Sequence, residues 1–116
     1  MKKNLPILLR LDGLVLTRKG LELTGIPIRK GGWDDLDQKI EKLRRRLPAV
    51  VVSHYDRLAR QYADPLSLLA GDVCQGCQRR ISRRAAVRAG RSQEVIQCEH
   101  CGRFIFTRTN APDYVT

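Results

Sequence analysis

The sequence has few aromatic residues and no long apolar run, and the second shortage excludes a membrane-spanning protein. Aromatic side chains make up 5% of the 116 residues, although a hydrophobic content of 42% is compatible with a folded domain. No apolar run approaches the roughly 18 residues that a membrane-spanning helix requires. The apolar stretch at residues 5–9 stops at Arg10, and no small-residue cleavage site follows, so we expect no export signal. The sequence therefore predicts a cytoplasmic protein without a membrane partner.

Signatures of catalysis are also missing. The sequence contains no phosphate-binding loop, no GxGxxG motif and no nucleophile with a base at a recognisable spacing. We therefore expect a protein that is not an enzyme.

Acidic residues are outnumbered by basic ones. The chain has 22 Lys+Arg against 12 Asp+Glu, which gives a net charge of +10. The excess lies at the two ends, because residues 1–32 and 74–116 each carry a net +5 and residues 33–73 are neutral. Such an excess indicates a polyanionic partner, with nucleic acid ahead of an anionic membrane surface.

The chain pattern predicts a small α+β fold with four segments. In residues 1–32, β-branched residues and leucines surround Lys19-Gly20, which predicts a basic N-terminal arm or a short hairpin. Residues 33–72 predict a helical segment kinked near Pro48, where a second helix of about Ala49 to Tyr62 can begin. Residues 73–110 contain all four cysteines, and residues 111–116 are predicted to be a flexible tail.

A single apolar seam runs along the first part of the helical segment. Leu36, Ile40, Leu43 and Leu47 follow one another at helical spacing. This seam favours core packing of two helices, and the alternative is that Leu36, Ile40 and Leu43 dock a second chain.

The four cysteines form two pairs of the type CxxC separated by 20 residues, and they are Cys74, Cys77, Cys98 and Cys101. A two-residue gap lets both sulfurs of a pair face one ion, and two pairs complete a tetrahedron. The spacing between pairs allows a β-hairpin that brings them together. We therefore expect one structural Zn²⁺ in a zinc ribbon. Iron remains open, whereas disulfides or a thioredoxin-like redox pair suit the cytosol and the double motif less well.

The sequence resembles the bacterial proteins that carry a C-terminal four-cysteine zinc ribbon after a long coiled coil. The residues that carry the resemblance are Leu47-Pro48, Tyr55-x-Arg57-Leu58, Gly71-x-x-Cys74-x-Gly76-Cys77 and Ile96-x-Cys98-x-x-Cys101-Gly102-Arg103-Phe104-Ile105-Phe106. The resemblance covers roughly residues 47–106, and the long coiled coil has no counterpart here. It implies links to RNA binding, to chaperoning of secretion and flagellar components, and to partnership with a sigma factor.

Basic side chains then suggest the partner. Arginine suits bidentate contacts with phosphate, and six arginines lie between the cysteine pairs. The predicted nucleic-acid contacts are Arg79, Arg80, Arg83, Arg84, Arg88, Arg91, Arg103, Lys2, Lys3, Arg18, Lys19, Arg29 and Lys30. Phe104 and Phe106 could stack on bases, although we expect them in the core.

The leading hypothesis is a zinc-ribbon protein that binds nucleic acid. RNA is preferred over DNA, and the partner would be a ribonucleoprotein such as the ribosome. The alternative is a protein–protein adaptor or chaperone for a secretion, flagellar or transcription partner.

Overall fold

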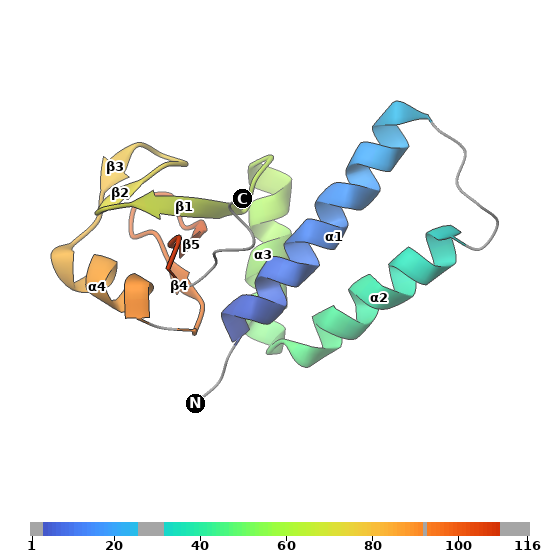
Figure 1. The fold of residues 1–116 in the computed structure, drawn as a ribbon, viewed down its shortest axis with the longest axis horizontal. Coiled ribbons are helices and arrows are strands. Elements are labelled where there is room, and N and C mark those ends of the chain that lie inside the picture. The colour runs from blue at the N-terminus through green and yellow to red at the C-terminus, as the bar shows by residue number, and fades with distance from the viewer. Residues whose placement is uncertain (1–3, 26–31, 92, 110–116) are drawn as a thin grey trace.

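The computed structural model describes residues 4–25, 32–91 and 93–109, which form a layer of helices beside a small mixed sheet (Figure 1). The helices are α1 (Asn4–Thr24), α2 (Gly32–Arg46), α3 (Ala49–Gln61) and α4 (Arg83–Arg91). The strands are β1 (Leu66–Ala70), β2 (Val73–Cys74), β3 (Arg79–Arg80), β4 (Ile96–Gln97) and β5 (Phe104–Phe106). The expected small α+β class is therefore correct.

Helix α1 replaces the arm or hairpin predicted for residues 1–32, so that prediction is wrong over the described part of the segment. The helix runs straight through Lys19-Gly20 and buries Leu5, Leu8 and Leu11. Pro6 is tolerated because it lies in the first turn, where its missing N–H has no intrahelical acceptor. Packing of the N-terminal half outweighs the low helix propensity of the glycines.

Helices α2 and α3 confirm the predicted break at Pro48. Pro48 stands at the N-cap of α3, and Arg44 joins the two helices by donating two hydrogen bonds of 2.8 Å to Asp56. The helical segment is shorter than the predicted 33–72, because α3 ends at Gln61 and residues 66–70 form β1.

The five strands lie in the order β3-β2-β1-β5-β4. Strand β1 is central: it pairs in parallel with β5 and antiparallel with β2. The outer strands β3 and β4 pair antiparallel with β2 and β5. The chain segments before and after α4 thus belong to opposite edges of one sheet.

One apolar core joins the helices to the sheet. Leu5, Leu43 and Tyr55 of three helices pack in a cluster with Phe104 and Phe106 of β5. Both phenylalanines are buried, as we expected from the sequence, so neither can stack on a nucleobase. A second cluster lies between the sheet and α4, and it contains the cysteines.

Candidate metal centre and basic surface

Each cysteine pair lies at the turn of its own short hairpin. Cys74 and Cys77 stand where β2 turns into β3, and Cys98 and Cys101 stand between β4 and β5. The predicted single hairpin between the pairs is not what the structure shows, because α4 occupies that stretch. The sheet brings the pairs together, since β1 pairs with one strand of each hairpin.

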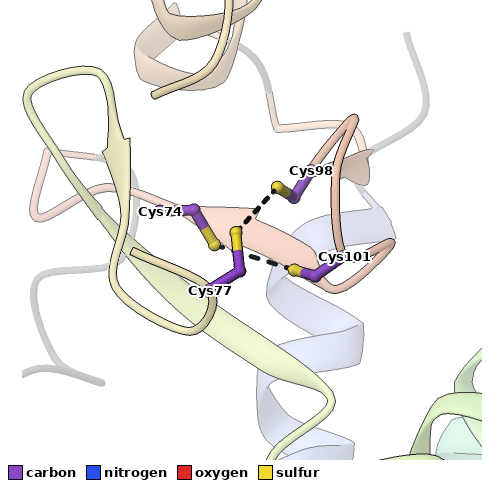
Figure 2. A group of neighbouring side chains, drawn as sticks. All are labelled: Cys74, Cys77, Cys98 and Cys101. Carbon is purple, nitrogen blue, oxygen red and sulfur yellow. Dashed lines mark hydrogen bonds between the residues drawn. The ribbon is translucent and has the colours of Figure 1, made fainter. Parts of the chain in front are cut away.

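The four sulfurs converge on a common point (Figure 2). All four ligand atoms lie within 4.8 Å of one another. The Sγ–Sγ distance is 3.9 Å between Cys74 and Cys101 and 3.7 Å between Cys77 and Cys98. Metal–sulfur bonds of about 2.3 Å in a tetrahedron give sulfur separations of about 3.8 Å. The thiols are therefore free and spaced to hold one metal ion, as the sequence predicted.

Hydrogen bonds make the Cys74 thiol more acidic than a free thiol. Burial raises the pKa of Cys74, but a hydrogen bond with Ser67 and hydrogen bonds with the backbone of Cys77 and Gly76 outweigh burial and lower the pKa to about 7. Burial raises the pKa of Cys98 to about 12. The lowered pKa favours the thiolate form of Cys74, which is the form that binds a metal ion.

Arg103 connects the metal centre to α3. Its guanidinium lies 3.8 Å from the centroid of the Tyr62 ring, and its Nε donates to the Asp64 carbonyl at 2.9 Å. The Tyr62 hydroxyl in turn donates to the Cys101 carbonyl at 3.2 Å. Burial lowers the pKa of Arg103, but a hydrogen bond to Cys101 and the charge of Asp64 outweigh burial, so the pKa is raised. The prediction that Arg103 contacts nucleic acid is therefore wrong: the side chain is buried against its own chain.

Helix α4 gathers four arginines on one exposed face. At about 100° per residue, Arg83, Arg84, Arg88 and Arg91 fall within an arc of about 140°, with Val87 among them. All four arginines are exposed, and Val87 is 46% exposed. The opposite face carries Ala85, Ala86 and Ala89, which pack on the cysteine cluster. In a strand Arg83 and Arg84 would lie on opposite faces, whereas the helix places them on the same face.

The arginine face of α4, meaning Arg83, Arg84, Arg88 and Arg91, carries no ion pair with any residue that the structure describes. None of these four side chains donates to a cysteine sulfur within that described part. They are therefore not required to balance the thiolates. Arg79 and Arg80 on β3 are exposed as well, and Arg80 lies 3.9 Å from Asp72.

The nucleic-acid contacts predicted near the N-terminus do not form a comparable face among the described residues. Arg18 donates hydrogen bonds to the carboxylates of Asp37 and Glu22 and lies over the Trp33 ring. Its positive charge is therefore paired with acidic residues of the same chain. Lys19 is exposed. The remaining members of the predicted set lie outside the described residues, and they are Lys2, Lys3, Arg29 and Lys30. The tail predicted at residues 111–116 also lies outside them.

The predicted docking seam faces the interior of the molecule. Leu43 is buried in the main core, and Ile40 packs against it. Leu36 is half-buried. The seam therefore packs in the core of its own chain, and a partner could not reach Leu43 without separating the helices.

Two supports of the metal centre escaped the sequence reasoning. Ser67 lies 3.3 Å from the Cys74 sulfur and accepts a hydrogen bond of 2.7 Å from the Gly76 N–H. Tyr62 is the other support. Nothing in the spacing of these residues from the cysteines marks them, because both lie in segments that come close only through the sheet.

Comparison with known proteins gives a likeness of fold. No family model and no curated protein matches the sequence. The fold is similar to the crystal structure of CT398 from Chlamydia trachomatis, with a TM-score of 0.52 and 21% sequence identity. The match covers 64% of this chain and 32% of that chain, so the chain spans about a third of the neighbour's length. At this identity the likeness concerns the fold alone.

Within residues 4–25, 32–91 and 93–109, no helix is both long and apolar enough to cross a bilayer.

Proposed function

We propose that this protein is an RNA-binding module whose basic surface is organised around one structural Zn²⁺. The single observation that carries the proposal is the arginine face of α4. Four exposed arginines share one helix face, and no ion pair with a described residue uses their charge. Guanidinium groups in such an array suit phosphate, which they bind through two hydrogen bonds each.

The zinc assignment rests on the donor set. Four cysteine sulfurs at tetrahedral separations leave no position for water or substrate, and a closed site of this kind is structural. In this role the ion would hold the two hairpins together. Because α4 lies between those hairpins, the ion would also fix the helix that carries the arginines.

RNA is favoured over DNA for two reasons. The exposed α4 face offers arginine and valine but no Asn or Gln, so in the wide major groove of DNA it could read guanine but not adenine. The small size and the net charge of +10 suit a component that contacts a folded ribonucleoprotein such as the ribosome.

Charge reversal at matched positions tests the proposal. We expect the triple variant Arg83→Glu, Arg84→Glu, Arg88→Glu to lose RNA binding by about a hundredfold or more at low salt, because each phosphate contact contributes separately. The control is Arg10→Glu, Lys42→Glu, Arg46→Glu on α1 and α2, where all three side chains are exposed and none belongs to the predicted nucleic-acid contacts. Either triple variant lowers the net charge from +10 to +4, so a difference reports position and not total charge.

Fluorescence anisotropy with a labelled RNA stem-loop is the measurement. Affinity for the wild-type protein should fall steeply between about 50 and 200 mM salt. Equal losses in the two triple variants, or affinity that does not change with salt, would contradict the proposal. Circular dichroism of both variants checks that they remain folded.

A further inference from the structure

The Phe, Tyr and Trp side chains that the structure describes are not available to stack on bases at the basic surface. Of the aromatic rings in the part of the chain that the structure describes, Tyr55, Phe104 and Phe106 are buried in the core. Tyr62 lies under the Arg103 guanidinium, and Trp33 lies under that of Arg18. Proteins that bind single strands combine a basic groove with exposed rings on which bases stack. No described Phe, Tyr or Trp ring lies exposed beside the arginine face of α4, and the exposed His100 ring is hydrogen-bonded to the Arg80 carbonyl at 2.8 Å.

The position of α4 is fixed at both ends. Ser82 caps its first turn by accepting from the Ala85 N–H at 3.2 Å, and Glu99 accepts from the Ser82 N–H at 2.6 Å. After the helix, the Gln93 carbonyl accepts a hydrogen bond of 2.8 Å from Leu5 at the start of α1. The arginines thus extend from a rigid support, which suits a ligand of fixed shape.

The arginine face is short and has arginines at both of its edges, which suits two rows of phosphates lying close together. Nine residues make α4 about 13 Å long, and the alanine face is packed on the sheet, so the helix cannot enter a groove completely. Arg83 and Arg88 lie at opposite edges of the 140° arc, with Val87 at an angle between them. In A-form RNA the major groove is deep and narrow, so the phosphates of the two strands approach each other across it.

We infer that the arginine face of α4 binds double-helical RNA, with the helix lying over the narrow major groove and its arginines on phosphates of both strands. The inference rests on the proposed function and adds the form of the ligand. Recognition would depend on shape and not on sequence, because the deep and narrow major groove of A-form RNA keeps the base edges out of reach of these side chains.

Binding of the zinc-loaded full chain to three labelled probes tests the inference. The probes are an RNA duplex of about 20 base pairs, one unstructured strand of it, and a DNA duplex of the same sequence, a length that exceeds the roughly 16 base pairs covered by a small duplex-binding domain. We expect the RNA duplex to bind about tenfold or more tightly than the single strand and the DNA duplex at equal salt. The triple variant on α4 should remove this preference, and the control triple variant should keep it.

Each outcome bears on a different statement. Single-stranded RNA that binds as tightly as the duplex would overturn the duplex inference and leave the proposed function standing. Equal affinity for DNA and RNA duplexes would overturn the assignment to the A-form groove. If no probe distinguishes the α4 triple variant from the control triple variant, both the inference and the proposed function fail.

Discussion

At the scale of single residues, the absence of a side chain at Gly76 makes room for Arg103. A Cβ atom built on Gly76 would lie 2.8 Å from both Cδ and Nη1 of Arg103. Arg103 cannot easily move aside, because Asp64 and the Tyr62 ring hold its guanidinium. Glycine at position 76 therefore preserves the contact between the first cysteine hairpin and the segment that follows α3.

We predict that Gly76→Ala destabilises the zinc-loaded protein by about 1–3 kcal/mol, because the added methyl group forces Arg103 out of its position. The control is Gly90→Ala in α4, where nothing lies within 4 Å of the added atom. That substitution should be neutral or stabilise by up to about 1 kcal/mol through helix propensity. Urea unfolding of both variants measures the difference, and a Gly76→Ala variant as stable as the wild type would refute the role given to Arg103.

The sequence predicted the metal ligands well at this scale and their supports poorly. The CxxC spacing determines how the two sulfurs of a pair can face one ion, so Cys74, Cys77, Cys98 and Cys101 were found without coordinates. Arg103 was predicted to contact nucleic acid because arginine suits bidentate contacts with phosphate. Its burial depends on Tyr62 and Asp64, whose proximity arises from the pairing of β1 with β5.

At the scale of elements, two errors of the sequence reasoning concern α1 and α4. Turn-forming glycine and β-branched residues favoured a hairpin around Gly20, but the buried leucines of the N-terminal half stabilise a helix. Helix α4 consists mainly of arginine and alanine, which are strong helix formers and separate onto opposite faces, so the sequence did carry its signal. Helix α1 was missed because tertiary packing outweighs local propensity there, whereas α4 was missed because a β-hairpin was expected between the cysteine pairs.

We predict that metal removal disorders the cysteine module, meaning residues 73–103, more than it disorders α1, α2 and α3. The module buries a small core of which the cysteines are a large part, so metal-binding energy is folding energy there. The three N-terminal helices retain their own apolar contacts. Hydrogen exchange should show faster exchange in β2, β3, α4 and β4 after chelation or in a Cys98→Ser variant. Unchanged protection of α4 in the metal-free protein would contradict this prediction.

At the scale of the whole molecule, the arginine face of α4 and the acidic start of α2 lie at opposite ends. Figure 1 shows α4 at one end of the long axis and the free end of the α1–α2 pair at the other. The molecule extends 49 Å along its longest axis. The arginine face therefore lies far from the acidic residues Asp34, Asp35 and Asp37 at the start of α2. A polyanion at the α4 end would not be repelled by them, because screening shortens their reach to about 10 Å.

The most direct test of the central claim is a titration of ¹⁵N-labelled, zinc-loaded protein with an RNA duplex, followed by amide chemical shifts. The account predicts that shifts change in residues 79–91 and that added salt reverses the changes, while signals of residues 33–46 stay in place. Changes confined to α1 and α2, or no change at low salt, would contradict the claim that the arginine face of α4 binds RNA.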